Sequence, residues 1–165
     1  MSEPRKPRHP GGNAFERPVL DESNRRILEE LQADARLTMA ELGRRVNLSA
    51  PAVAERVQRL ERAGVIAGYR ALVEPKAVGY PIAVLVRIRP TPGQLQKIPE
   101  LARETPEVVE CSRITGEDCF FMKLHLREMD DLEPILDRFI VYGQTTTSII
   151  HSSPVPPRSV PLGLP

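Results

Sequence analysis

The sequence predicts an α+β protein in which a three-helix unit precedes a β-α-β-β-α-β unit. Three observations lead to this fold class. Apolar residues recur every three or four positions between residues 20 and 66, which is the period of a helix. After residue 81, short β-rich stretches separated by two helical patterns take over. Between the two regions, both patterns are interrupted by Glu74, Pro75, Gly79 and Pro81.

The N-terminal part begins with an arm and a first helix. Residues 1–18 are rich in Pro, Gly and Arg and show no periodicity, so we expect a disordered arm. The helical unit is predicted over residues 19–66. Asp21 is a suitable N-cap for its first helix, whose apolar stripe consists of Ile27, Leu28 and Leu31.

Two short helices joined by a tight turn follow. Thr38 and Glu41 have the spacing of a capping box, in which each side chain bonds an unpaired backbone N–H of the first turn. Ser49 is a second N-cap, and Pro51 lies in the next first turn, where its missing N–H is tolerated. We expect this helix to end at about Ala63.

The second of these helices has two different sides. Val53, Val57 and Leu60 fall on one side, whereas the other carries several arginines. This is the layout of a DNA-binding helix-turn-helix, with the turn from Ser49 nearest the base edges and the arginines on phosphate. A solvated face in an ordinary helical bundle is the alternative. The predicted DNA contacts are Thr38, Arg44, Arg45, Ser49, Ala50, Pro51, Ala52, Glu55, Arg56, Arg59 and Arg62.

A connector separates the two units. Residues 67–80 are predicted to contain a short strand, because Tyr69 to Val73 alternate in polarity, followed by a linker. A strand here would fit a winged helix-turn-helix, although its pairing partner is not evident from the sequence. We place the domain boundary near residues 75–80.

The second unit, residues 81–152, has the order expected of a ferredoxin-like fold, with four antiparallel strands and both helices on one face. The capping box of the second helix of this unit is assigned to Asp130 and Glu133. In the first helix, Pro99 means either that the helix starts late or that it is kinked. The open sheet face would need a cover, for which a second copy is the simplest candidate. Residues 153–165 are predicted to be an extended, proline-rich tail. Strands are predicted at 82–89, 107–114, 119–126 and 145–152, and helical patterns at 95–103 and 130–142.

Composition narrows the function classes. The formal net charge is +1, so DNA contacts must come from local clusters of arginine. Aromatic residues make up 4% of the chain, which does not favour stacking on single-stranded bases. Two cysteines do not form a secreted disulfide framework, and no Cys/His spacing suggests zinc or another cofactor. The chain has neither a membrane-spanning run nor the apolar core of a signal peptide, so we expect a cytoplasmic protein.

An enzyme is one alternative to a regulator. His9, His125 and His151 are isolated, and Cys119 follows Asp118, whose charge would raise the pKa of the thiol rather than activate it. We therefore expect no enzymatic activity. A metabolite-binding or assembly protein that no longer reads DNA is a second alternative, and the absence of salt-dependent DNA binding would identify it.

Three segments in this order, residues 48–66, 115–126 and 142–158, resemble the leucine-responsive regulatory protein/asparagine-regulator (Lrp/AsnC) family of transcription factors. The resemblance covers residues 19–158. It implies binding to double-stranded DNA, a homodimer formed through the C-terminal sheets or a higher homo-oligomer, and an amino acid or related metabolite as effector.

The resemblance also implies where the effector binds. Turn amides and hydroxyls could hold a carboxylate, while Glu117 or Asp118 could hold an ammonium group. For the Thr-rich stretch, β propensity at a dimer interface is the alternative explanation. The implied effector contacts are Gly116, Glu117, Asp118, Thr145, Thr146, Thr147 and Ser148.

Overall fold

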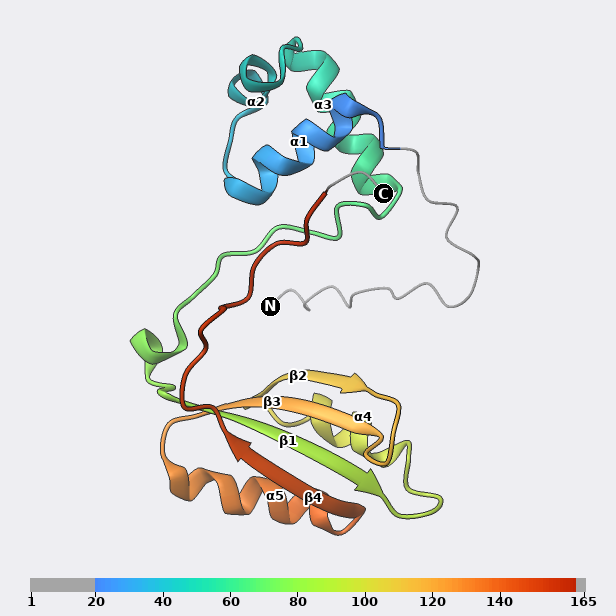
Figure 1. Ribbon diagram of the computed structural model, residues 1–165, viewed down its shortest axis with the longest axis vertical. Helices are drawn as coiled ribbons and strands as arrows, with labels where there is room; N and C mark the ends of the chain where they lie inside the picture. The colour runs from blue at the N-terminus through green and yellow to red at the C-terminus, as the bar shows by residue number, and fades with distance from the viewer. Residues whose placement is uncertain (1–19, 163–165) are drawn as a thin grey trace, which may run out of the picture. The chain divides into compact units, whose positions relative to one another are not determined.

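The computed structural model describes residues 20–162 and divides into two compact units (Figure 1). The first joins the chain up to Arg70 with the segment that starts at Ser159, and the second comprises Ala71–Arg158. The division therefore falls before the boundary expected from the sequence. The predicted arm, residues 1–18, lies outside the described residues. Each unit has its own hydrophobic core.

Three helices form the first unit. Their bounds are α1 Glu22–Ala33, α2 Met39–Val46 and α3 Ala50–Arg62. Each contributes a side chain that is fully removed from solvent: Ile27, Leu42 and Val53. Burying one such side chain contributes about 1.5–3 kcal/mol, so the core fixes how the three helices pack against one another. Leu162, from the C-terminal segment, packs against the same core.

The helix starts follow the sequence prediction with two exceptions. Thr38 and Glu41 form only half of the expected capping box, because the Glu41 side chain accepts from Arg45 Nη2 instead of from the Thr38 backbone. The second exception is Ser49. Asp21 Oδ1 accepts the backbone N–H of Asn24 at 2.7 Å, and Thr38 Oγ1 accepts that of Glu41 at 3.2 Å. Ser49 has the extended backbone of an N-cap, but its side chain makes no capping hydrogen bond. The start of α3 therefore depends on its proline-containing first turn and on core packing rather than on the Ser49 hydroxyl.

The turn between α2 and α3 is tight. Asn47 has φ 57°, a left-handed conformation that asparagine tolerates better than most residues. Gly43 approaches the following turn so closely that an added Cβ would lie 2.6 Å from the Leu48 carbonyl oxygen. The sequence thus permits the sharp change of direction that separates the two helices.

The strand expected within residues 67–80 is not formed. Residues 67–74 adopt neither helix nor strand, and a 3₁₀ turn, η1, follows at Pro75–Val78. A strand needs a neighbour for its backbone hydrogen bonds, and within residues 20–162 no strand pairs with this segment. Leu72 is accordingly 83% exposed.

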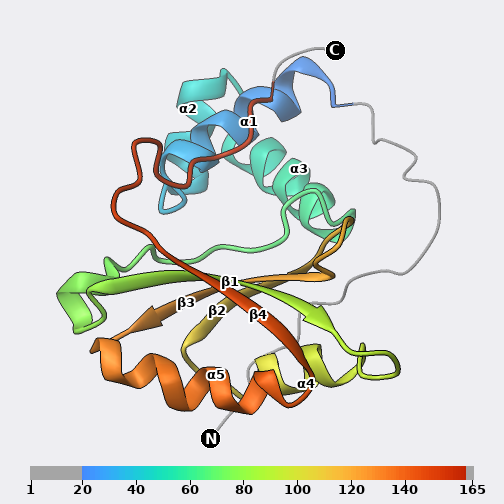
Figure 2. The ribbon, with the colours of Figure 1, turned by 60° about the horizontal axis from the view of Figure 1, so that its bottom comes forward.

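The second unit has the predicted β-α-β-β-α-β order. Its strands lie side by side in the order β2-β3-β1-β4, every pair antiparallel, and Figure 2 shows both helices on one face of the sheet. The bounds are β1 Ile82–Pro90, α4 Lys97–Arg103, β2 Val108–Arg113, β3 Phe120–Leu126, α5 Leu132–Ile140 and β4 Gly143–Ile149.

The structure decides between the two alternatives for the first helix of this unit and corrects the predicted start of the second. Pro99 lies in the first turn of α4, so the helix starts late and is not kinked. The capping box assigned to Asp130 and Glu133 is wrong, because a short 3₁₀ turn, η2 (Met129–Asp131), precedes α5. The reciprocal capping bonds instead join Glu128 and Asp131.

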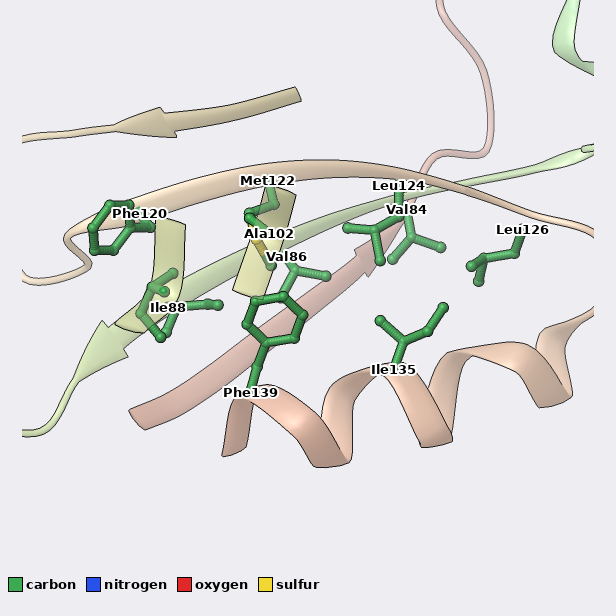
Figure 3. Packing of buried hydrophobic residues seen from close by; sticks show 11 residues of the cluster. Val84, Val86, Ile88, Ala102, Phe120, Met122, Leu124, Leu126, Ile135 and Phe139 are labelled. Carbon is green, nitrogen blue, oxygen red and sulfur yellow. The ribbon is translucent and has the colours of Figure 1, made fainter. Parts of the chain in front are cut away.

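One face of the sheet is buried beneath the two helices. Alternate residues of β1 and β3 point into this core, where Phe139 and Ile135 of α5 meet them (Figure 3). The intervening residues occupy the opposite face, called the open face below. Because Leu85, Arg87 and Arg89 alternate with buried residues of β1, they lie on the open face, as does Phe121 of β3.

Candidate DNA-binding and effector sites

Helix α3 presents its solvent side as the sequence predicted. Val53, Val57 and Leu60 are buried in the core, which turns the opposite side outward. The first turn carries small side chains, with Ser49 and Pro51 exposed and Ala50 and Ala52 half-buried. Small side chains leave room for the backbone of this turn to come close to a partner molecule.

Arg56 is held inside the unit. Its Nη1 donates to Asp21 Oδ2 at 2.6 Å and to Asn24 Oδ1 at 3.0 Å, and its side chain is 29% exposed. The guanidinium lowers the pKa of the Asp21 carboxyl, with help from the Asn24 backbone N–H. One carboxylate therefore caps α1 and anchors α3, which gives Arg56 a structural partner thirty-five residues away in the sequence.

The other arginines predicted to contact DNA differ in whether they form ion pairs within the protein. Arg45 Nη1 lies 2.8 Å from Glu30 Oε2, which ties α2 to α1. Arg59 pairs with Glu55 at 2.7 Å one turn away along α3, and both side chains are well exposed. Arg44 and Arg62 are exposed, and neither forms an ion pair with another residue in the range 20–162. Arg44, Arg59 and Arg62 are thus available to an anionic partner at little cost.

The turn between β2 and β3 brings two of the predicted effector residues onto the open face. Asp118 Oδ2 lies 3.4 Å from Arg87 Nη1, and Asp118 Oδ1 lies 3.9 Å from Arg89 Nε. Glu117 also pairs with Arg89. Gly116 has φ 109°, a conformation that favours glycine.

Sequence reasoning missed the two arginines of this cluster. The pattern that could have revealed them is the alternation in the predicted strand 82–89, where Arg87 and Arg89 stand on either side of Ile88. Period-two alternation places both side chains on the face opposite Ile88. An alternating basic pair on a strand is easily interpreted as a solvated edge, and the carboxylates that face it come from a turn about thirty residues later.

The Thr-rich strand contributes to two different faces. Thr146 lies opposite Arg87 and therefore belongs to the open face, as does Ser148 opposite Leu85. Thr145 and Thr147 are paired with the buried residues Ile88 and Val86, so they point toward the helices. Thr145 lines a cavity of about 290 Å³ beside α5. The structure therefore does not bring all four predicted residues into one site.

Burial shifts the pKa of one cysteine and one histidine of the second unit. Burial raises the pKa of the Cys111 thiol, which disfavours the reactive thiolate. Burial also lowers the pKa of His125, with the nearby Lys123 adding to the effect. Over residues 20–162, no group of three or more His, Cys, Asp or Glu could hold a metal ion, and no helix there has the length and apolarity to cross a membrane.

Comparison with known proteins identifies both units. Residues 20–67 match a winged helix-turn-helix DNA-binding family, and residues 83–160 match the Lrp/AsnC ligand binding domain. A DNA-binding helix-turn-helix followed by a ligand-binding domain defines a transcriptional regulator. The HTH-type transcriptional regulator LrpC of Bacillus subtilis is 34% identical over 133 residues, covering 81% of this chain and 92% of that protein. The chain belongs to the Lrp/AsnC family of transcriptional regulators.

Solved structures agree with this assignment. The structure of Bacillus subtilis LrpC matches with a TM-score of 0.78 over 81% of this chain and 96% of that chain, at 34% identity. The feast or famine regulatory protein of Mycobacterium tuberculosis, solved with L-methionine, gives 0.80 over 86% and 99%, at 34% identity. A Neisseria meningitidis regulator, also solved with L-methionine, gives 0.79 over 87% and 97%, at 27% identity.

Proposed function

We propose that this protein reads specific sites in double-stranded DNA and that an amino acid or related metabolite modulates its activity. The observation that carries the DNA proposal is α3, which buries one side in the core and presents a small-residue turn and exposed arginines on the other. Amino acid sensing is supported by the ligand-binding domain match and by the two relatives solved with L-methionine.

The DNA contacts divide into two kinds. Ser49, Ala50 and Ala52 would meet base edges, and Thr38, Pro51 and Glu55 would complete that contact surface. Arg44, Arg59 and Arg62 would neutralise phosphates and supply affinity without sequence preference. Arg45 and Arg56 would instead keep the three helices in position, because both are bonded to α1 and its cap.

A second copy of the chain is the proposed cover for the open face. Leu85 and Phe121 place apolar surface there, among side chains of both charges. A two-fold axis matches such a mixed surface to itself. A dimer or larger homo-oligomer would then present two α3 helices to half-sites one helical turn, about 34 Å, or a multiple of it apart.

Fluorescence anisotropy of the full chain on DNA tests the regulator proposal. The probe is the region upstream of its own gene, and unrelated DNA of equal length at the same salt is the control. Binding at least a hundredfold tighter to a site within the probe, or to a site selected from random DNA, is expected of a sequence reader. Equal, weak binding to all of these would refute sequence reading and favour a metabolite-binding or assembly protein.

A matched pair of variants tests how the contacts are divided. Arg62→Gln should weaken binding to cognate and unrelated DNA by the same factor, because phosphate contacts carry no sequence information. Ala52→Ser should change the preferred site while leaving binding to unrelated DNA nearly unchanged. If both variants lose the same factor on both DNAs, the assignment of base and phosphate contacts is wrong.

A further inference from the structure

The helical unit begins beside α3. Leu20 packs against the core of that unit, and Asp21 Oδ2 accepts a hydrogen bond from Arg56 Nη1 of α3 at 2.6 Å. The pKa of the Asp21 carboxyl is lowered mainly by Arg56 and also by the charge of Arg59, one turn further along the helix. The arm, residues 1–18, therefore joins the folded unit next to α3.

The side of α3 at this junction is the one proposed to meet DNA. Arg56 lies about 60° around the helix from the buried Val53. Ala52 and Arg59 follow at about 100° and 120° in the same direction. Ala52 is a proposed base contact and Arg59 a proposed phosphate contact, so the chain enters the unit on the flank that carries both.

The arm carries the positive charge that the rest of the chain lacks. It contains Arg5, Lys6, Arg8 and Arg17 against two glutamates, an excess of two positive charges. Because the formal net charge of the whole chain is +1, residues 19–165 have a net charge of −1. Three of the four cations fall within the segment PRKPR, residues 4–8, whose prolines disfavour a helix. A narrow basic segment of this kind suits a groove bordered by phosphates.

The length of the arm is sufficient to reach a second groove. Twelve residue steps separate Arg8 from Leu20. A chain of that length spans up to about 40 Å when extended and about 19 Å on average when coiled. From a recognition helix in the major groove, the neighbouring minor groove is half a helical turn away, about 17 Å.

We propose that Arg5, Lys6 and Arg8 of the arm bind the minor groove beside the half-site that α3 reads. This inference rests on the proposed sequence-specific DNA binding and adds a second element of recognition to it. A·T-rich DNA has a narrow minor groove whose negative potential attracts arginine and lysine. Guanine places an amino group in that groove, so flanking G·C pairs are the unfavourable case.

Fluorescence anisotropy of the full chain tests the proposal without any substitution. Half-sites selected from random DNA stay fixed, while the half turn beside each of them, about five base pairs, is made A·T, G·C or inosine·C. Inosine lacks the amino group of guanine, so inosine·C resembles A·T in the minor groove and G·C in the major groove. We expect A·T and inosine·C flanks to bind at least about fivefold tighter than G·C flanks.

A triple variant with Arg5→Gln, Lys6→Gln and Arg8→Gln then assigns the preference to the arm. It should bind the A·T-flanked site at least about tenfold more weakly and no longer distinguish the flanks. The slope of log affinity against log salt concentration should also fall by about 2–3, because three cations near phosphates are removed.

The matched control replaces Arg103, Arg113 and Arg138 by glutamine. All three are exposed residues of the second unit, and the change in net charge is the same. This variant should keep the flank preference and the affinity of the original chain within about twofold.

Four outcomes would overturn the proposal. An arm variant that binds like the control would remove the arm from the interface while reading by α3 stands. Loss of affinity in the arm variant without a flank preference in the original chain would assign the arm to phosphates rather than to the minor groove. If inosine·C flanks bind as G·C flanks do, the preference lies in the major groove. Equal, weak binding of the original chain to every DNA would refute sequence reading itself, and the arm contact with it.

Discussion

Replacing Arg56 by alanine should weaken cognate DNA binding without removing a phosphate contact. Arg56 donates to Asp21 at 2.6 Å and to Asn24 at 3.0 Å, so its loss frees α3 from the cap of α1. Hydrogen bonds to charged groups contribute about 1.5–3 kcal/mol when sheltered. Because the Asp21 side chain is half exposed, we discount this to about 1 kcal/mol of unfolding free energy.

The salt dependence of binding separates the two roles of an arginine. Each phosphate contact adds about 0.9 to the slope of log affinity against log salt concentration. Arg62→Ala should lower that slope by about this amount, whereas Arg56→Ala should leave it unchanged and weaken cognate DNA more than unrelated DNA. Anisotropy titrations at four or five salt concentrations measure both quantities. A slope for Arg56→Ala that falls as far as that for Arg62→Ala would refute the positioning role.

The partner of Arg56 offers an independent check. Asp21→Asn should reproduce part of the effect of Arg56→Ala. The double variant should lose no more than Arg56→Ala alone, because that change already breaks the ion pair with Asp21 as well as the bond to Asn24. The depressed pKa of Asp21 means that the pair stabilises the unit above the usual carboxyl pKa of 3.8. Its contribution is then lost as the pH falls below that value and through the folded pKa. Additive losses in the double variant would show that the two residues act separately.

Three further predictions concern stability. Gly43→Ala should cost about 1–3 kcal/mol in thermal unfolding, because its Cβ would lie 2.6 Å from the Leu48 carbonyl oxygen, and an unchanged midpoint would contradict this contact. Phe139→Ala should cost about 3–5 kcal/mol in urea unfolding, because the ring is fully buried, and a loss under 1 kcal/mol would refute the packing described. Burial and Glu61 raise the pKa of Tyr69 to about 12, so neutral Tyr69 stabilises the fold below pH 10, and this contribution is lost as the pH rises through about 12. Tyr69→Phe should remove the tyrosinate absorbance step near that pH, and its persistence would assign the step to another tyrosine.

Local patterns predicted the helices and core faces well, since periodicity determines which side chains are buried. Phe120, Met122, Leu124 and Leu126 share one face as expected. The strand expected at residues 69–73 did not form, because a strand requires a partner that local sequence cannot supply.

The charged contacts were harder to predict than the core. Asp21 and Arg56 are far apart in the sequence, and so are Arg89 and Glu117. Nothing in the local pattern of either residue indicates its partner. Local sequence was also insufficient for the Thr-rich strand. Only its register against β1 reveals that Thr145 and Thr146 lie on opposite faces of the sheet.

The position of Leu162 has a consequence for how the protein is made. The ribosome delivers α1, α2 and α3 early, but the last apolar side chain of their core is synthesised only after the whole second unit, Ala71–Arg158. During translation the nascent DNA-binding unit therefore exposes a patch that Leu162 later covers. Domains generally fold as units from the N-terminus onward. Here that order leaves the first unit incomplete until Leu162 has been synthesised, a period in which a chaperone would have an apolar surface to bind.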